Sequence, residues 1–406
     1  MADTRRFEMV EGSSSKFWQV TVEGTSVTVT YGRIGSTGTA KTTEYPSADK
    51  AQAEADKLVR EKTKKGYQEI GSAVVNWRPP AHIGTQDHVD RFLNYKVSRF
   101  NPGSDGEGDD EGGGREFPSL RDLDKRVFRV GLTYDDSEDE FGARLDALFA
   151  DKKIGELRGL VIGPWFSEVC EEAPSPLFEK LVAHGRDLKS LEGLFVGDIF
   201  QEECEISWIH QGDYGPTLRA LPQLRTLVVR GGDGLRFSNL EHEGLRSLTV
   251  QTGGLSATAV KDIVNAKLPS LRELTLWLGV ENYGGNSTVE DLAPLLAGDR
   301  FPNLEHLGLQ DSENADEIAI AVAKSPLLGR LKGLDLSMGT LSDDGARALV
   351  ESPSTRKLTY LNIRHHYVSA EVVKELKGLG IEVNASDRKA DESDGDETYR
   401  YAEVTE

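Results

Sequence analysis

Cysteine is scarce in this sequence, since only Cys170 and Cys204 occur among 406 residues. Two cysteines cannot form a disulfide framework or a zinc site by themselves, and their scarcity is typical of a reducing compartment. Long apolar runs are also missing: nowhere do about 18 apolar residues follow one another, as a membrane-spanning helix requires. The first residues, MADTRRFEMVEGSSSKF, lack the apolar segment of a secretory signal. We therefore expect a cytoplasmic protein with no membrane partner.

Motifs for catalysis and cofactor binding are absent as well. The sequence has no GxxxxGK[ST] phosphate loop, no strand-linked GxGxxG, no HExxH and no GxSxG. His365 and His366 are adjacent after an expected strand and would point to opposite faces, so they do not predict a shared metal. The acidic loop at 202–205 offers a poor ligand set. We expect no enzymatic activity, no cofactor and no metal; a hydrolase hidden in the 197–215 insertion is the weakest alternative.

Charge is distributed unevenly along the chain. Acidic residues outnumber basic ones by 68 to 48, which gives a net charge of −20. Residues 1–70 hold 11 Lys and Arg against 10 Asp and Glu, a net of +1, so the remaining 336 residues carry −21. This split argues against phosphate binding by the larger part but leaves the first 70 residues eligible. The acidic segments 101–116 and 384–406 are expected to be solvated and poorly ordered.

The first 70 residues have the pattern of a small sheet packed on one helix. Apolar and polar residues alternate over 16–23 and 26–34, with Gly24-Thr25 as the turn, and 39–45 gives a third strand. After Pro46 the apolar spacing becomes helical. Ser47 is the expected N-cap and Gly66 the expected stop. Trp18 alternates with polar neighbours and is expected in the core.

These residues resemble a WGR domain. The resemblance is carried by Lys16-Phe17-Trp18, by Tyr31-Gly32-Arg33-Ile34-Gly35 and by the helix end Lys62–Tyr67, and it covers about residues 5–70. In poly(ADP-ribose) polymerases this module contacts DNA near strand breaks, so the resemblance implies such contacts at Tyr31 and Arg33. Tyr31 stands where the family name has Trp and offers a smaller aromatic face. The candidate nucleic-acid-binding residues are Tyr31, Arg33, Lys41, Lys62, Lys64 and Lys65. A protein-contact or purely structural role for this domain is the alternative.

The rest of the chain repeats the motif Leu-x-x-Leu-x-[Leu/Ile/Val]. It occurs nine times, at spacings of 18 to 34 residues that average about 27, which is the range of leucine-rich repeats. The apolar positions of one repeat cannot be covered by that repeat alone, but stacked neighbours bury them together. The first leucines are Leu157, Leu191, Leu224, Leu245, Leu271, Leu304, Leu331, Leu358 and Leu376.

Short helical patterns separate the expected strands, with Ser256, Thr288, Ser342 and Ser369 at their starts. Residues 117–153 have the pattern of an N-terminal cap, and 94–100 that of a first edge strand. The predicted fold class is therefore α/β: a ribonuclease-inhibitor-like leucine-rich-repeat solenoid with a small N-terminal α+β WGR domain. The expected domains are 1–70 (WGR), 71–116 (linker with an acidic Gly-rich segment), 117–383 (capped solenoid) and 384–406 (acidic tail).

Several blocks, including GDIFQEECEISWI at 197–209 and LWLGVENYGG at 276–285, resemble an uncharacterised bacterial family of leucine-rich-repeat proteins over about 82–406. This resemblance implies a fold and no activity.

One residue per repeat, directly after the sixth motif position, is expected to face the concave surface of such a solenoid. The candidate protein-binding residues in this row are Arg230, Gln251, Trp277, Gln310, Ser337 and Arg364. An exposed Trp and Arg are typical of protein interfaces, whereas flanking loops that cover Trp277 are the alternative. We predict a non-enzymatic adaptor that binds a protein partner through this face and is tethered by the WGR domain to nucleic acid or a second protein. The alternative function is a regulator that responds to nucleic-acid ends.

Overall fold

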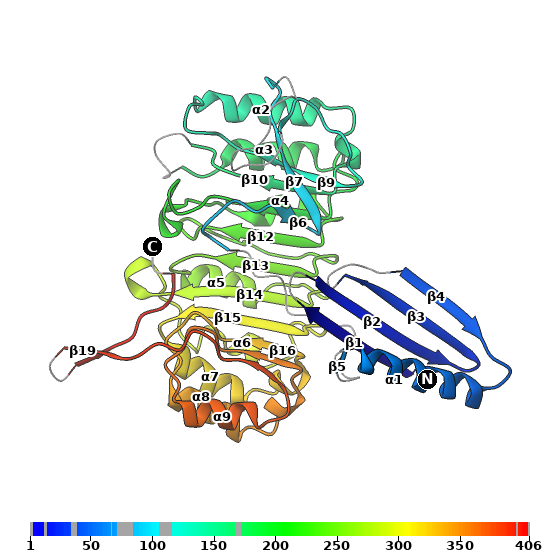
Figure 1. The fold of residues 1–406 in the computed structure, drawn as a ribbon. Helices are drawn as coiled ribbons and strands as arrows, with labels where there is room; N and C mark the ends of the chain where they lie inside the picture. Colours follow the sequence, from blue (N-terminus) through cyan, green and yellow to red (C-terminus); the bar gives the residue numbers. More distant parts are fainter. Residues whose placement is uncertain are drawn as a thin grey trace. The chain divides into compact units, whose positions relative to one another are not determined.

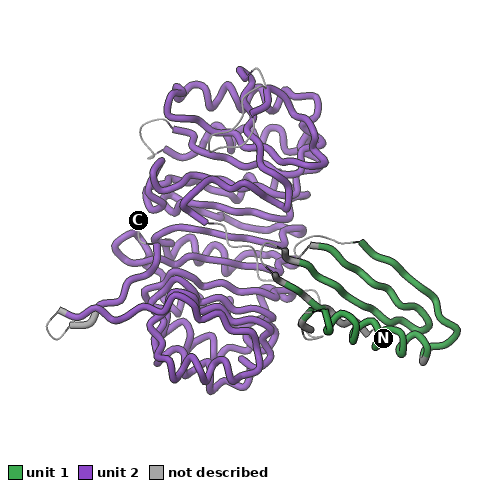
Figure 2. The backbone as a smooth tube through the Cα atoms, in the orientation of Figure 1, with its two compact units in different colours: residues 1–79 green, residues 80–406 purple. Residues whose placement is uncertain are grey.

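The computed structural model divides the chain into two compact units, residues 1–79 and 80–406, coloured separately in Figure 2. It describes residues 3–11, 14–33, 39–65, 67–70, 84–104, 116–166, 172–394 and 397–404. We call the two parts the N-terminal unit and the C-terminal unit. The expected Gly66 stop, most of the acidic run 101–116, and Cys170 lie outside the described residues.

The N-terminal unit is an antiparallel sheet with one helix. Its strands are β1 (Asp3–Glu11), β2 (Ser14–Glu23), β3 (Ser26–Arg33), β4 (Thr39–Glu44) and β5 (Gln68–Ile70), in the order β4-β3-β2-β1-β5. Helix α1 (Ala48–Lys64) begins at the expected N-cap, since the Ser47 side chain accepts a hydrogen bond from the Lys50 N–H. The three predicted strands and the helix are confirmed, and β1 and β5 are additions that the pattern did not predict.

The core of this unit lies between the sheet and α1. Phe7, Trp18 and Val20 come from the sheet, and Ala51 and Ala55 from the helix face turned toward it. Trp18 is buried, as expected, and its ring centroid lies 5.4 Å from that of Phe7. A separate core of this kind makes the unit compact in itself.

The C-terminal unit is built on one long sheet whose strands follow the sequence (Figure 1). From β9 to β18 every neighbour is parallel and consecutive, and β7 pairs with β9 in parallel at the N-terminal edge, where β6 and β8 add two-residue strands. The strands are β6 (Arg91–Phe92), β7 (Tyr95–Phe100), β8 (Glu116–Phe117), β9 (Arg126–Val130), β10 (Gly159–Ile162), β11 (Gly193–Val196), β12 (Thr226–Arg230), β13 (Ser247–Gln251), β14 (Glu273–Gly279), β15 (His306–Ser312), β16 (Gly333–Asp335), β17 (Tyr360–Asn362) and β18 (Glu382–Asn384).

Helices connect the strands and pack on one face of this sheet, where strand leucines and helix residues share a single apolar core. The α-helices are α2 (Asp139–Ala150), α3 (Ser175–His184), α4 (Tyr214–Ala220), α5 (Ala257–Val264), α6 (Ala293–Leu296), α7 (Ala315–Lys324), α8 (Asp343–Glu351) and α9 (Ala370–Lys377). Ser256 and Ser369 cap α5 and α9 by accepting N–H groups of the first turn, as expected. The cap expected at Thr288 is wrong, because α6 begins only at Ala293.

The leucine motif predicts the strands with a constant offset. A strand begins two residues after the first leucine in every repeat from Leu157 to Leu358. The ninth motif is wrong in register: Leu376 is buried in α9, and the last strand, β18, begins only at Glu382. The motif spacing therefore also arises at a helix end, where Leu376 lies in α9 and Leu379 follows that helix by two residues in the turn.

Two segments outside the predicted repeat join the C-terminal unit. Residues 91–100 form β6 and β7, so the sheet begins inside the expected linker. In the tail, β19 (Glu392–Asp394) and β20 (Glu397–Tyr399) form a hairpin. The chain then folds back, so that Val404 packs against Trp277 and its N–H donates to Asp311 of β15. The expectation of a solvated, poorly ordered tail is wrong for these last residues.

No helix among the described residues is long and apolar enough to cross a membrane. Cys204 is buried and disulfide-bonded. A disulfide is at odds with the reducing compartment that cysteine scarcity predicted, so the cytoplasmic location stays a prediction.

Candidate functional sites

The C-terminal end of α1 places a lysine over two aromatic rings. The Lys62 ammonium lies 5.6 Å from the ring centroid of Trp18 and 4.9 Å from that of Tyr67. Partial burial, reinforced by the charge of Lys65, lowers the pKa of Lys62. A cation over aromatic faces is attracted by their negative π density. Lys62 therefore connects the helix end to the sheet and is only partly available to a ligand.

Tyr31 and Lys41 lie on the same face of the sheet as Trp18. Tyr31 is directly opposite Trp18 in the β2–β3 register, and Lys41 is opposite Val29 on the neighbouring edge strand. The Tyr31 side chain is 50% exposed although its partner is buried. Directly opposite residues of antiparallel strands project from one face. The register thus brings together Trp18, Tyr31 and Lys41, which lie far apart in sequence.

The end of α1 adds exposed positive charge to this region. Lys64 and Lys65 are exposed, and Arg60 precedes them in the last turns with Glu61 as the nearest acid in sequence. The backbone of Arg33 pairs with Lys16 beside Tyr31, while the Arg33 side chain lies outside the described residues. We call the group Tyr31, Lys41, Lys62, Lys64 and Lys65 the basic end of the N-terminal unit.

The row expected on the concave surface is present but covered. Trp277 is 1% exposed, and Arg230, Gln251, Gln310 and Ser337 are buried with it. Arg364, at the end of the row, keeps 29% of its side chain exposed. The expectation that this row is open to solvent is therefore wrong for all but Arg364. The structure instead has the alternative, in which other segments of the chain cover Trp277.

The row is a hydrogen-bonded ladder. Trp277 Nε1 donates to Gln310 Oε1 at 2.8 Å, and Gln310 Nε2 donates to Ser337 Oγ at 3.1 Å. Arg230 donates from Nε to Gln251 at 3.1 Å and from Nη1 to the Ile199 carbonyl at 2.8 Å. Burial lowers the Arg230 pKa to about 10. The polar atoms that a partner would use are thus already satisfied within the chain.

Besides Ile206 of the insertion after β11, which packs with Trp277, two more distant chain segments make the cover. Arg230 Nη2 donates to the Gly84 carbonyl at 2.6 Å, which holds the segment leading into β6 against the sheet. From the other end, Val404 packs with Trp277 and Met338, and its N–H donates to Asp311 at 2.9 Å. Glu403 forms an ion pair with Arg364. No sequence pattern signalled that these distant segments would occupy the face.

One arrangement of ligating groups lies beside the tail. Atoms of His365, Asp387 and Glu403 all lie within 4.8 Å of one another. Both carboxylates are already compensated, because Arg364 pairs with Asp387 and Glu403, and Lys389 lies 2.9 Å from Asp387. These cations compete with a metal for the same oxygens, so the set favours an ion-pair network.

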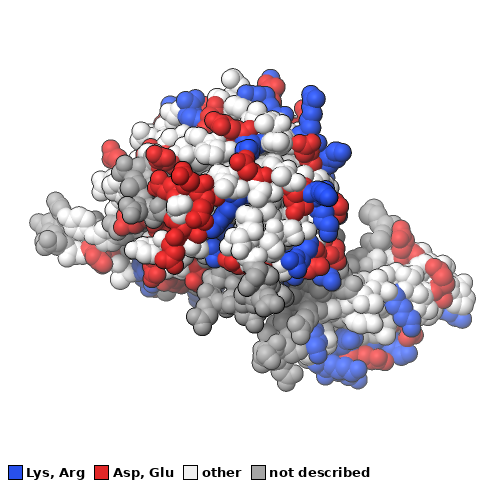
Figure 3. Space-filling model, turned by 90° about the horizontal axis from the view of Figure 1, so that it is seen from above, with Lys and Arg blue, Asp and Glu red and all other residues white. Residues whose placement is uncertain are grey.

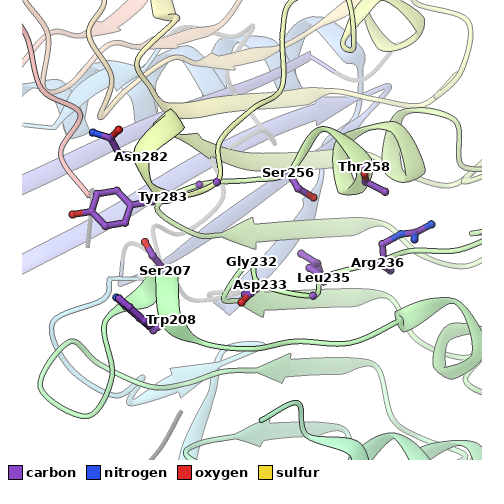
Figure 4. A pocket seen from close by; sticks show the side chains of 13 residues that line it. Ser207, Trp208, Gly232, Asp233, Leu235, Arg236, Ser256, Thr258, Asn282 and Tyr283 are labelled. Atoms are coloured by element: carbon purple, nitrogen blue, oxygen red, sulfur yellow. The ribbon is translucent and has the colours of Figure 1, made fainter. Parts of the chain in front are cut away.

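A cavity of about 590 Å³ opens among the loops that follow four consecutive strands, β11, β12, β13 and β14 (Figure 4). Ser207, Trp208, Asn282 and Tyr283 lie toward one end, and Arg236 and Thr258 toward the other. Trp208 is 53% exposed. In repeat proteins, loops on one side of the stack often form the binding surface. In the sequence, the only indication of this cavity was the insertion at 197–220, which contains Trp208.

Glycine allows the loops around this cavity to approach closely. A Cβ on Gly254 would lie 2.0 Å from the Tyr283 carbonyl, and one on Gly279, whose φ is +69°, would lie 1.8 Å from the Gly253 carbonyl. The charges at the cavity have partners: His210 pairs with Asp233 at 2.7 Å, and Arg236 pairs with Asp262 at 2.7 Å. The cavity therefore offers aromatic, amide and hydroxyl groups rather than free charge.

Comparisons with known proteins agree with the architecture of the N-terminal unit. Residues 4–74 match the WGR domain family, which confirms the resemblance seen around Tyr31-Gly32-Arg33. The uncharacterized protein YfeS of Escherichia coli K12 is 43% identical over 65 residues, which are 16% of this chain and 27% of YfeS. The chain therefore spans about a quarter of the length of this curated relative.

A second comparison extends over nearly the whole chain. A Bacteroides fragilis protein, whose crystal structure comes from the Northeast Structural Genomics Consortium, is 32% identical with a TM-score of 0.61. The match covers 95% of this chain and 97% of that protein, so this chain belongs to the same family as the Bacteroides protein. An internalin from Listeria monocytogenes is 13% identical over 64% of this chain and 67% of its own, with a TM-score of 0.32, and supports no argument.

Proposed function

We propose that this chain is a non-enzymatic binding protein whose WGR domain binds nucleic acid through its basic end. The observation that supports this most is the cross-strand placement of exposed Tyr31 beside Trp18, with Lys62 over the Trp18 ring. An exposed aromatic flanked by ammonium groups matches a base or sugar at a strand end together with backbone phosphates. The large acidic remainder of the chain does not contribute to this binding.

Fluorescence anisotropy with a labelled, nicked duplex at several salt concentrations tests the proposal. The variant Lys64→Gln/Lys65→Gln removes two phosphate contacts, so the slope of log affinity against log salt should fall by about 2. Lys50→Gln/Lys57→Gln makes the same charge change in the earlier turns of α1 and serves as the control. Equal losses in both variants, or no salt-dependent binding by the full chain, contradict the proposal.

Tyr31→Ala tests recognition of the strand end. Loss of its aromatic face should weaken binding to the nicked duplex by about tenfold and leave binding to an intact duplex unchanged, since stacking contributes about 1–3 kcal/mol per base. Equal weakening on both duplexes would mean that Tyr31 contacts nucleic acid without recognising the strand end. The unit 1–79 should bind more tightly than the full chain, and added salt should narrow that difference because it screens the acidic remainder.

We also propose that the C-terminal unit is a leucine-rich-repeat solenoid of the ribonuclease-inhibitor type that binds a protein partner. Consecutive parallel strands, helices on one face and the constant motif offset support the fold. The exposed Trp208 beside the cavity of Figure 4 supports the binding surface. With Trp277 covered, we assign partner binding to the loop side rather than to the covered row.

A pair of aromatic variants tests this second binding function. Trp208→Ala should remove a specific partner from affinity captures of the native host extract, whereas Tyr134→Ala, which alters a 94% exposed aromatic outside the cavity, should not. An unchanged capture profile for Trp208→Ala counts against the loop side as the binding surface.

A further inference from the structure

Three arginines stand in line at the start of three neighbouring strands. Arg225, Arg246 and Arg272 each directly precede the first residue of β12, β13 and β14. The Arg246 N–H donates to the Arg225 carbonyl and the Arg272 N–H to the Arg246 carbonyl, both at 2.8 Å. Because neighbouring strands are about 4.8 Å apart, the backbone fixes these arginines at short, equal intervals. We call them the arginine ladder.

The fold leaves the middle of this ladder without a counter-ion. At the same repeat position, the flanking strands carry Glu192 and Glu305; Glu192 pairs with Arg158 at 3.3 Å, and Glu305 with Lys332 at 2.9 Å and Arg272 at 3.8 Å. Within the part of the chain that the structure describes, no carboxylate lies within 4.0 Å of Arg246 or Arg225. The Arg225 guanidinium donates to the carbonyls of Pro222 and Leu224.

Stacking like charges on adjacent strands costs stability. The ladder nevertheless lies in the C-terminal unit, where carboxylates outnumber basic groups: residues 71–406, which include this unit, carry a net charge of −21. On the C-terminal unit in Figure 3, Asp and Glu side chains form one large group, whereas Lys and Arg side chains are scattered. The chain's own carboxylates leave the middle of the ladder unpaired, so a bound anion can supply the missing negative charge.

The ladder lines a cavity of about 660 Å³. Lys189 adds a fourth basic side chain, and Glu192 and Glu273 are the two carboxylates in the lining. Glu192 is engaged by Arg158, and burial raises the pKa of Glu273. Four cationic groups, three of them with the forked geometry that suits phosphate and carboxylate oxygens, therefore surround one hollow.

We propose that this cavity binds a small polyanion whose phosphate or carboxylate groups are spaced along the arginine ladder. The strand spacing sets the demand on the ligand: it must present two or three anionic groups at intervals of about 5 Å. Phosphate and carboxylate share the chemistry that guanidinium recognises, so the probe compounds must distinguish them. This site is separate from the nucleic-acid contact assigned to the WGR domain.

Isothermal titration of the full chain with inorganic tripolyphosphate and, in a second arm, with citrate tests the proposal at low salt. Saturable binding is expected, and the tighter arm identifies the anionic group. Arg246→Gln should weaken binding at least about tenfold, the loss typical of one charge-assisted hydrogen bond. Arg219→Gln makes the same charge change at an exposed position of α4 outside the cavity and should have no effect.

A second variant gives a change of opposite sign. Glu273→Gln removes a carboxylate from the lining and should strengthen binding of the same probe several-fold, an increase that a misfolded protein cannot produce. The proposal is overturned if neither probe binds at millimolar concentration, or if Arg246→Gln and Arg219→Gln weaken binding equally. Binding that survives Arg246→Gln but is lost in Lys64→Gln/Lys65→Gln also overturns it, because the anion would then sit on the WGR domain.

Discussion

The indole of Trp277 donates a hydrogen bond of 2.8 Å to Oε1 of Gln310, and both side chains are buried beneath the returning end of the chain. Trp277 of β14 packs with Ile206, Met338 and Val404, so one residue joins the insertion after β11, the loop after β16 and the tail. A large aromatic with a satisfied N–H contributes both apolar burial and orientation. This position is therefore structural in the conformation described.

Trp277→Ala should destabilise the C-terminal unit strongly. It removes a large buried side chain and leaves Gln310 Oε1 without its donor, and such changes cost about 3–5 kcal/mol. Trp277→Phe should cost less, because most of the apolar volume remains. Denaturant unfolding measures both, and a cost under about 1 kcal/mol for Trp277→Ala would contradict the packing described here.

Detachment of the C-terminal residues 401–404 should be visible in the tryptophan fluorescence of the protein. Val404→Asp puts a charge next to Trp277 and should detach residues 401–404, which exposes the indole and shifts its fluorescence to longer wavelength. The change is measured against the same substitution in a Trp277→Phe background, where the shift should vanish. Glu392→Ala, at an exposed position of the hairpin, is the control and should leave the spectrum unchanged.

Asp311→Asn should stabilise the protein at neutral pH. Burial raises the pKa of Asp311 well above its ordinary value, so the stability that its protonated form provides is present at low pH and lost as pH rises. Asn keeps the oxygen that accepts the Val404 N–H and tolerates the positive φ of 55° at this position. Thermal unfolding across pH 4–8 should show a gain that shrinks toward pH 4. A constant difference across this range would contradict the burial argument.

His306 should make stability fall in weak acid. Burial lowers its pKa to about 4, so between the unfolded value near 6.5 and pH 4 the unfolded chain binds a proton that the folded chain does not. The contribution of neutral His306 to the free energy of unfolding is fully present above pH 6.5 and falls by about 3 kcal/mol as the pH drops to 4. His306→Gln should flatten this part of the unfolding profile, whereas His184→Gln, at a partly exposed site, should not.

Two glycine substitutions should change stability in opposite directions. Gly279→Ala places a Cβ 1.8 Å from the Gly253 carbonyl at a φ of +69°, so we expect a loss of at least about 2 kcal/mol and a disturbed cavity. Gly142→Ala lies within α2 with open space around the added Cβ, and a helical alanine is favoured over glycine by about 0.5–1 kcal/mol. Chemical denaturation compares the two with the parent chain.

Local pattern was sufficient wherever a residue's role depends on its neighbours in sequence. The alternation at 16–23 and 26–34 gave β2 and β3, the Ser47 cap gave the start of α1, and the motif leucines from Leu157 to Leu358 gave eight strands. The motif failed at Leu376 because the end of a helix and the turn after it also bury leucines three residues apart, here Leu376 in α9 and Leu379 after it. The pattern could not separate these two uses of the same spacing.

The sequence by itself determined the strand order of the large sheet, since stacked repeats contact only their neighbours in the chain. It also determined the WGR domain, because the residues that carry the family resemblance, such as Tyr31-Gly32-Arg33, can be read directly from the sequence. Only the tertiary structure decided what is exposed. The covering of Trp277 by Val404 and of Arg230 by the Gly84 carbonyl joins segments that are 127 and 146 residues apart, and no local spacing encodes such contacts.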